Sequence, residues 1–325
     1  MRAIVCATLG PPEDLVVGDM PDPEPGPGDI AIAVEMASFN FPDLLIIRGA
    51  YQFRADPPFV PGAEGAGTIV ALGDGVTGLH VGQRVAAVAS HGAFAQRWVV
   101  DAATAIPIPD GVSSAVAAVS TMTYGTSYHA LAQRARLSPG ETLLVLGAAG
   151  GVGSAAVELG KAMGATVIAA ASTDDKLAFC RELGADATIN IVEDDVRSRI
   201  KELTSGRGVD VVYDPVGGDL TETAFRSIAW EGRYLVVGFA TGDIPSLPLN
   251  LPLLKGASVM GVFWGSFATR DPATNRSNAN AIFDLIERGV IAPRTMEVVS
   301  FDDFARGFEL MATRRVTGKI ALSIL

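Results

Sequence analysis

The spacing of apolar residues changes near residue 113 of this 325-residue chain. Before that point, short β-branched runs are separated by Gly, Pro and Asp, a pattern that predicts strands joined by turns. Residues 21–28 alternate Pro with Asp, Glu and Gly, which favours a stiff loop. One helix is expected over 41–48, and the expected strands cover 2–8, 30–37, 67–72, 84–89 and 93–100.

From residue 113 onward, the pattern predicts a first helix over 113–136 and then helices alternating with uncharged strands. The strands are expected at 143–147, 166–171, 187–190, 209–214 and 234–238, and the helices at 152–164, 174–184, 195–204 and 220–228. Apolar strands between helices indicate a parallel sheet covered on both faces, the doubly wound α/β arrangement. After residue 264 the alternation loosens, with helices expected at 279–288 and 301–313 and a strand at 319–325.

Composition narrows the class of protein. Apolar residues make up 49% of the chain and charged residues 19%, and the net charge is -11. An acidic chain lacks the positive field of a nucleic-acid-binding protein, so no nucleic-acid partner is expected. No run reaches the roughly 18 apolar residues of a membrane span, and the N-terminus lacks the apolar segment of a signal peptide. Cys6 and Cys180 lie far apart, which fits a reducing compartment, so a cytoplasmic location is expected.

The strongest chemical signal is Leu143-Leu-Val-Leu-Gly-Ala-Ala-Gly-Gly-Val-Gly153, in which an apolar strand runs into a glycine-rich turn and a helix. It matches the dinucleotide fingerprint G-x-G-x-x-G, with Ala148, Gly150 and Gly153 at the three glycine positions. Glycine lets the backbone approach a pyrophosphate, and the helix N-terminus faces its charge. A small-residue turn of an ordinary α/β fold is the alternative. The residues expected to contact the dinucleotide here are Ala149, Gly150, Gly151 and Val152.

The following strand bears on the choice between NAD and NADP. An NAD site places Asp or Glu about 20 residues beyond the glycines, where it binds the ribose 2′-hydroxyl. In this chain Ala171 takes that position, and Ser172 and Lys176 follow it. Hydroxyl and ammonium donors suit a 2′-phosphate, which a carboxylate would repel. We therefore expect NADPH as the cofactor, although Lys176 could also be a solvated helix lysine.

Six motifs, spread over nearly the whole chain, carry a family resemblance. They are NFPDLLIIRGAY (40–51), FVPGAEGAG (59–67), VGQRV (81–85), TYGTSYHA (123–130), AAGGVG (148–153) and GKIAL (318–322). Together they resemble the medium-chain dehydrogenase/reductase superfamily, and within it the zinc-free quinone oxidoreductase (zeta-crystallin-like) group.

The resemblance implies a chaperonin-10-like (GroES-like) β-rich catalytic domain over 1–120 plus 266–325 and a Rossmann NADP-binding domain over 121–265. It also implies a homodimer in which edge strands pair through the apolar run 257–263, although that run could be an internal strand. Zinc-dependent relatives carry a cysteine near the position of Asn40 and a histidine at that of Ala63. This chain has neither, so no metal site is expected.

Without a metal to polarise a carbonyl, the expected hydride acceptor is a quinone or an activated C=C bond. A side chain must then supply a proton and stabilise the developing negative charge. Tyr51 is the first candidate, because zinc-free enoyl reductases of the superfamily carry a proton-donating tyrosine at similar spacing. A packing or surface tyrosine is the alternative. Asn40 is expected to donate to the substrate or the nicotinamide ribose, or else to stabilise a turn.

The resemblance also implies cofactor contacts outside the glycine turn, with ordinary core as the alternative. Those residues are Thr126, Gly238, Phe239, Phe263, Trp264 and Lys319. Two acidic residues near the motif of Asn40 are expected to have structural roles. Glu64 is expected to be a buried, hydrogen-bonded carboxylate rather than a general base, and Asp43 is expected to support the short helix, through a pair with Arg48 or by positioning Asn40 and Tyr51.

Three functions are compatible with these features. The leading prediction is an NADPH:quinone oxidoreductase with a small-molecule substrate. The second is an NADPH-dependent enoyl-CoA or alkenal (C=C) reductase, for which Arg48, Arg54 and Arg270 could help to bind CoA. The third is a non-catalytic NADPH-binding protein, which the intact glycine turn and the candidate proton donor make the least favoured.

Overall fold

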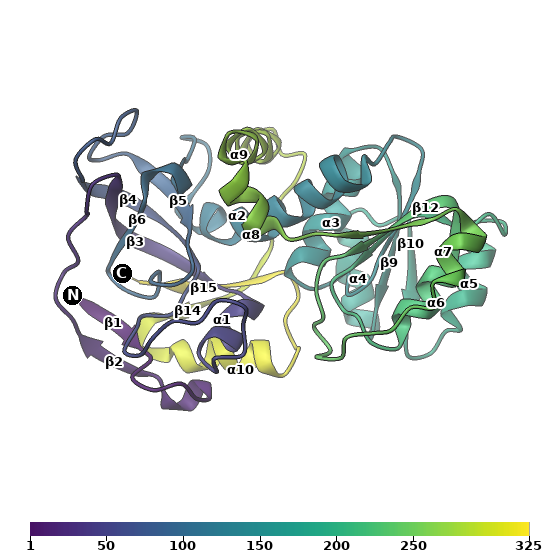
Figure 1. The fold of residues 1–325 in the computed structure, drawn as a ribbon, viewed down its shortest axis with the longest axis horizontal. Coiled ribbons are helices and arrows are strands. Elements are labelled where there is room, and N and C mark those ends of the chain that lie inside the picture. The colour runs from purple at the N-terminus through teal and green to yellow at the C-terminus, as the bar shows by residue number, and fades with distance from the viewer. Residues whose placement is uncertain (325) are drawn as a thin grey trace. The chain divides into compact units, whose positions relative to one another are not determined.

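The computed structural model describes residues 1–324, and Figure 1 shows the helices and strands. The chain divides into two compact units. The first comprises residues 1–122, 272–288 and the chain from 293 onward, and the second comprises residues 123–271 and 289–292. The return to the first unit was expected at residue 266. It comes later because residues 264–270 form one continuous helix, α8, that belongs to the second unit.

The first unit is built on a seven-stranded sheet with the order β14-β15-β3-β4-β5-β7, and β6 also pairs with β3. Only the β14–β15 pair is parallel; every other pair in this sheet is antiparallel. The strands are β3 (Asp29–Phe39), β4 (Glu64–Leu72), β5 (Arg84–Val88), β6 (Arg97–Asp101), β7 (Ile106–Pro107), β14 (Thr295–Ser300) and β15 (Lys319–Ser323).

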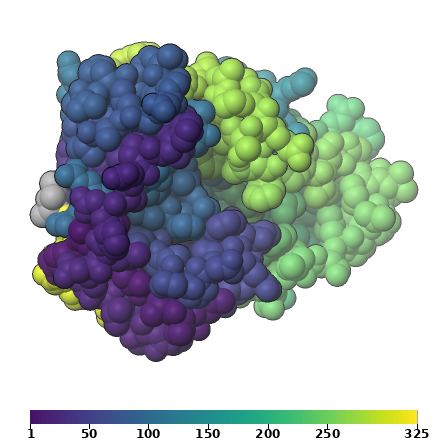
Figure 2. Space-filling view, turned by 60° about the vertical axis from the view of Figure 1, so that its left-hand side comes forward, coloured from purple at the N-terminus to yellow at the C-terminus, as the bar shows by residue number. Residues whose placement is uncertain are grey.

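One hydrophobic core fills the first unit. The rings of Phe39, Phe94 and Phe308 meet at its centre, with centroids 5.0 to 6.1 Å apart. A separate antiparallel pair, β1 (Arg2–Val5) and β2 (Val16–Asp19), completes the strands, and Figure 2 shows these purple N-terminal residues at the surface of the unit. The helices are α1 (Phe41–Ile46), the start of α2 (Ser114–Tyr128), α9 (Pro272–Glu287) and α10 (Phe304–Ala312).

The second unit contains a six-stranded parallel sheet with the order β10-β9-β8-β11-β12-β13. Its strands are β8 (Thr142–Val145), β9 (Thr166–Ala171), β10 (Ala187–Asn190), β11 (Val209–Asp214), β12 (Ile228–Val236) and β13 (Ser258–Gly261). The strands β9, β10 and β11 have the predicted bounds. The order confirms the doubly wound fold, because the chain proceeds outward from β8 in one direction and from β11 in the other.

Helices connect these strands. They are the end of α2, α3 (Gly151–Ala162), α4 (Asp174–Glu182), α5 (Val196–Leu203), α6 (Leu220–Arg226), α7 (Asn250–Lys255) and α8 (Trp264–Arg270). The predicted helix over 113–136 is split, because α2 is followed by a π-helical segment, His129–Ala135. Arg136 then adopts a left-handed conformation, with a φ of 51°, which ends the helix.

Other sequence-based bounds were wrong where polar residues interrupt an element. The strand expected at 234–238 begins six residues earlier, at Ile228, and the polar residues of Glu231-Gly-Arg233 lie inside it. The helix expected at 279–288 begins earlier, at Pro272. Its first two turns are polar, so the apolar pattern did not indicate them. Five of the strands and α-helices were not predicted, namely β2, β7, α7, α8 and β14.

Candidate functional site

The glycine-rich turn of the second unit connects β8 to α3. Gly147 adopts a φ of 58°, in the left-handed region that favours glycine. A Cβ atom at Gly153 would lie 2.2 Å from the carbonyl oxygen of Gly147, so only glycine permits this close approach of helix and turn. Gly150 is the N-cap of α3 and offers no side-chain cap to the first N–H groups of the helix. These exposed donors and the small turn fit a pyrophosphate group.

The turn lies where a doubly wound sheet binds ligands. Strands β8 and β11 are neighbours, and the chain leaves them in opposite directions across the sheet. Ligands of such sheets bind beyond the carboxyl ends of these two strands. The predicted contact residues Ala149, Gly150, Gly151 and Val152 all follow β8 at this edge.

The end of β9, the neighbouring strand, carries the residues predicted to select the phosphate. Ala171 ends the strand and is buried, and half-buried Ser172 follows it. Thr173 caps α4 by accepting a hydrogen bond from the Lys176 N–H at 3.4 Å, which places Lys176 in the first helical turn. The first acid of α4, Asp174, accepts a hydrogen bond from the Asn190 side chain at 3.3 Å. A hydroxyl and a lysine therefore follow the end of β9, and the Asp174 carboxylate between them is already hydrogen-bonded.

Two of the other predicted cofactor residues in the second unit, Trp264 and Phe239, pack their rings against glycines. The indole ring of Trp264 covers Gly125, where a Cβ atom would lie 2.9 Å from the ring, so it lies beside Thr126. Phe239 packs in the same way against Gly217, at 2.8 Å from a Cβ there. Gly238 lies two residues beyond the end of β12, and its N–H donates to the Asp214 carbonyl at 3.3 Å. Phe263 is 61% exposed.

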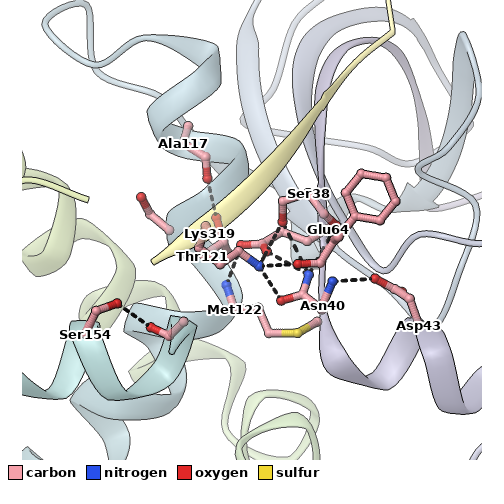
Figure 3. Close-up of polar contacts among 12 residues, drawn as sticks. Ser38, Asn40, Asp43, Glu64, Ala117, Thr121, Met122, Ser154 and Lys319 are labelled. Carbon is pink, nitrogen blue, oxygen red and sulfur yellow. Dashed lines mark hydrogen bonds and ion pairs between the residues drawn. The ribbon is translucent and has the colours of Figure 1, made fainter. Parts of the chain in front are cut away.

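In the first unit, five side chains form what we call the buried polar cluster: Ser38, Asn40, Asp43, Glu64 and Lys319 (Figure 3). Glu64 is fully buried and accepts hydrogen bonds from the Ser38 hydroxyl at 2.5 Å and the Asn40 amide at 3.0 Å. Its other oxygen accepts from the Met122 N–H at 2.7 Å. The expectation of a buried, hydrogen-bonded Glu64 is confirmed.

The Asn40 side chain is directed into this cluster. Its amide nitrogen donates to Glu64, and its oxygen accepts from the Lys319 ammonium at 2.6 Å. Both polar ends are therefore occupied within the first unit, and the residue is only 5% exposed. The expected donation from Asn40 to the substrate or ribose stays a prediction, and the geometry favours a role in supporting its neighbours.

The Lys319 side chain, like that of Asn40, is buried and directed into the buried polar cluster. Its ammonium donates to the Phe39 carbonyl at 2.8 Å and to Asn40, and it lies 3.5 Å from Glu64. Burial lowers the pKa of Lys319, and the nearby carboxylate of Glu64 opposes this effect. The ammonium therefore neutralises Glu64 inside the unit, and any effect of Lys319 on a cofactor would act through this cluster.

Asp43 supports the start of α1. One carboxylate oxygen accepts a hydrogen bond from the Asn40 N–H at 2.7 Å. Within residues 1–324 the other oxygen, Oδ1, is buried without a hydrogen-bond partner. Burial raises the pKa of Asp43 to about 7, although the Asn40 N–H and the Lys319 ammonium lower it. Asp43, the third residue of α1, thus binds the backbone of the N-cap residue Asn40, and no ion pair joins it to Arg48 in the described part of the chain.

Tyr51 lies five residues beyond the end of α1. Its ring is half-buried and packs against the core of the first unit. Burial, and secondarily the charge of Asp43, raises the pKa of Tyr51. The hydroxyl therefore keeps its proton at neutral pH, as a proton donor must.

The sequence interpretation did not single out two polar residues that organise these sites, Ser38 and Asp214. Ser38 binds Glu64 from inside β3, and Asp214 binds Tyr234 at the carboxyl end of β11. The available signal was a polar residue at the end of an apolar strand, as in Val209-Asp-Val-Val-Tyr-Asp214. Their partners lie 20 or more residues away, so the pattern alone could not identify them.

A zinc ion does not fit the side chains present. Across residues 1–324, no group of three or more His, Cys, Asp or Glu side chains is arranged to hold a metal. At the two positions where the resemblance implies zinc ligands in zinc-dependent relatives, this chain has Asn40, whose amide is engaged, and Ala63, which has no donor. Within the same described range, no helix is both long and apolar enough to cross a membrane.

Comparison with known families defines the class of protein. The alcohol dehydrogenase GroES-like domain family matches residues 26–110, and the zinc-binding dehydrogenase family matches residues 151–279. The chain belongs to the medium-chain dehydrogenase/reductase superfamily, and within it to the quinone oxidoreductase group. The predicted family and fold class are confirmed.

Individual relatives cover nearly the whole chain. Quinone oxidoreductase-like protein 2 of Mus musculus is 37% identical over 99% of this chain and 92% of its own length. Prostaglandin reductase-3 of Mus musculus is 34% identical over 94% of this chain and 84% of its own length. The crystal structure of Escherichia coli quinone oxidoreductase complexed with NADPH aligns with a TM-score of 0.93, at 29% identity, over 99% of this chain and all of that one.

Proposed function

We propose that this protein is a zinc-independent NADPH:quinone oxidoreductase that reduces a small-molecule quinone. The observation that carries the proposal is the glycine turn at the switch point of the parallel sheet, where Gly153 permits an approach that no larger residue would allow. The relatives with quinone oxidoreductase names and the NADPH complex of the Escherichia coli enzyme support it.

The second unit holds the cofactor. The first N–H groups of α3 bind the pyrophosphate, and Ser172 and Lys176 bind the 2′-phosphate. Thr126, Gly238 and the aromatic residues of the neighbouring loops contact the nicotinamide half. When bound, NADPH supplies a hydride to the substrate.

The first unit supplies the proton chemistry. Tyr51 keeps its proton at neutral pH because burial and Asp43 both disfavour the phenolate. It donates its hydroxyl proton, or a hydrogen bond, to the oxygen on which negative charge develops. The buried polar cluster fixes the chain segment before Tyr51, because the Asn40 N–H donates to Asp43 in α1 and the Asn40 side-chain oxygen accepts from Lys319.

A C=C reductase is the second candidate. Its support is a relative named prostaglandin reductase-3 together with the protonated Tyr51, since reduction of an enone also needs a proton at carbon or at the enolate oxygen. A non-catalytic NADPH-binding protein is the third candidate, and it would bind the cofactor without turnover.

The deciding experiment is a screen of NADPH oxidation with a quinone, an enal and an enoyl-CoA thioester. Rapid turnover of the quinone alone supports the leading proposal, and a preference for either alkene supports the second. Activity should survive prolonged chelation, because the side chains do not fit zinc. Stoichiometric zinc in the active protein would contradict the zinc-independent mechanism.

A further inference from the structure

The carboxylate of Asp214 lies at the topological switch point of the second unit. Asp214 is the last residue of β11, the strand beside β8, and the glycine-rich turn follows β8. The side chain is 3% exposed. A buried carboxylate at this edge of the sheet needs an explanation, because burial of an uncompensated charge is costly.

Four hydrogen bonds compensate the charge. Oδ1 accepts from the N–H groups of Val216 and Gly217 at 2.8 and 2.9 Å. Oδ2 accepts from the Tyr234 hydroxyl at 2.6 Å and the Thr221 hydroxyl at 3.2 Å. A carboxylate accepts about four hydrogen bonds, so its capacity is filled. Asp214 therefore has no acceptor left for a substrate or a cofactor hydroxyl.

The bonds to Oδ1 hold a turn that needs support. Gly217 and Gly218 both adopt left-handed φ values, of 67° and 68°. Glycine loses more conformational freedom on folding than any other residue, so this turn needs other contacts to stay ordered. The bonds to Oδ2 anchor the same carboxylate to α6 and β12. The Asp214 side chain thus connects the turn after β11 to strand β12 of the sheet and to helix α6.

The turn after β11 touches both loops predicted to bind the cofactor. A Cβ atom at Gly147 would lie 2.7 Å from the Val216 side chain, so Val216 packs directly against the glycine-rich turn. On its other side, the Val216 carbonyl accepts a hydrogen bond from Thr241 at 3.0 Å, and Phe239 packs against Gly217. Any shift of the turn after β11 would therefore move the surfaces on which a dinucleotide rests.

We propose that Asp214 is a positioning residue for the nicotinamide cofactor: it preorganises the 215–218 turn, and through it the glycine-rich turn and the loop of Phe239. The inference rests on the proposed binding of NADPH to the second unit. Asp214 acts through backbone groups and does not touch the cofactor.

The test is the NADPH dissociation constant of Asp214→Asn, measured by fluorescence titration without any electron acceptor. Both oxygens of Asp214 accept hydrogen bonds, and the variant replaces one of them by an amide nitrogen that cannot accept. The affinity for NADPH should therefore fall about tenfold. Asp210→Asn is the matched control, because Asp210 lies on the same strand and accepts from the Thr142 N–H at 2.7 Å and from Arg207 at 2.6 Å. It should bind NADPH as the unmutated protein does, even where its thermal stability falls.

Unchanged NADPH affinity in folded Asp214→Asn, or an equal loss in Asp210→Asn, would overturn the inference. Should Asp214→Asn fail to fold, hydrogen exchange of the unmutated protein decides. Protected Val216 and Gly217 amides without cofactor support preorganisation, and amides protected only after NADPH is added overturn it. Failure of the unmutated protein to bind NADPH would instead contradict the proposed function, so the two failures are distinguishable.

Discussion

The ammonium of Lys319 lies 2.6 Å from the side-chain oxygen of Asn40, although 279 residues separate them in the chain. The antiparallel pairing of β15 with β3 sets Ile320 opposite Phe39, so the next residues along each strand meet. Glu64 on β4 completes the contact from the other side of β3. The last strand of the protein thus neutralises the buried carboxylate beside the α1 cap.

Replacing Lys319 by Met should leave Glu64 as an uncompensated buried charge. We expect the free energy of unfolding to fall by about 3–5 kcal/mol, the usual effect of breaking a buried ion pair. The double variant Lys319→Met, Glu64→Gln should recover part of this loss, because no unpaired charge remains. Urea unfolding of both single variants and the double variant measures the coupling, and strictly additive losses would show that the two charges do not interact.

The stability of the protein should depend on pH through Asp43. Its pKa rises from 3.8 to about 7 on folding, so the neutral acid is the form that the fold favours. The resulting stabilisation is fully present below pH 3.8 and is lost as the pH rises through 7. Asp43→Asn resembles the neutral acid. Relative to this variant, the free energy of unfolding of the unmutated protein should fall by up to about 1.4 kcal/mol per pH unit between pH 4 and 7.

Equilibrium unfolding of both proteins at several pH values tests the role of Asp43. Asp186→Asn is a control of opposite sign, because the hydrogen bond and charge of Lys161 hold the pKa of Asp186 below its usual value. The contribution of the Asp186 carboxylate to the free energy of unfolding is lost only as the pH falls through its lowered pKa. A stability difference between the unmutated protein and Asp43→Asn that stays constant from pH 4 to 8 would contradict the prediction.

Tyr51→Phe should separate the two substrate classes. An enone needs a positioned proton donor, which typically contributes 10²–10⁴-fold, whereas water can protonate a hydroquinone anion. We therefore expect kcat for an enone to fall by about a hundredfold or more, and kcat for a quinone to stay within roughly tenfold. An equal fall with both substrates would mean that Tyr51 positions the substrate. Unchanged kcat with both would leave Tyr51 a packing residue, and thermal melting checks that the fold is intact.

NADPH should bind at least tenfold more tightly than NADH, a difference of about 1.4 kcal/mol. The reason is the neutral end of β9, where Ser172 and Lys176 follow buried Ala171. Lys176→Ala should remove much of this preference, while Lys201→Ala, on an exposed face of α5, should retain it. Calorimetric titration of both nucleotides measures the ratio, and equal affinities in the unmutated protein would refute the assignment.

The protein should form a homodimer through β13. This strand is at the edge of the six-stranded sheet rather than inside it, and Val259 on it is 48% exposed. Leu253 and Leu254 in the preceding helix are 79% and 69% exposed. An open apolar edge pairs readily with a second strand, and lysine prevents such pairing. Light scattering at micromolar concentration should show a dimer for the unmutated protein and a monomer for Val259→Lys.

Val298→Lys is the matched control for the dimer. Val298 is a 54% exposed valine on β14, which is also an edge strand, but in the sheet of the first unit. This variant should stay dimeric. A monomeric unmutated protein, or dissociation of both variants alike, would count against pairing through β13.

The sequence by itself determined the elements whose causes are local. Buried parallel strands are short uncharged runs, so β9, β10 and β11 could be predicted to the residue. The glycine-rich turn could be predicted as well, because the conformation of Gly147 and the absence of a Cβ at Gly153 are properties of one short stretch of the chain. These local features sufficed to indicate a dinucleotide site.

Only the tertiary structure decided which polar groups are satisfied by which partners. Asn40 and Tyr51 were recognised from their spacing, but the engagement of the Asn40 amide by Glu64 and Lys319 depends on the register of three strands. The same holds for Oδ2 of Asp214, which accepts from hydroxyl groups of α6 and β12. Hydrogen bonds and ion pairs between distant residues depend on strand order and register, and these are fixed by packing of the whole unit rather than by any local pattern.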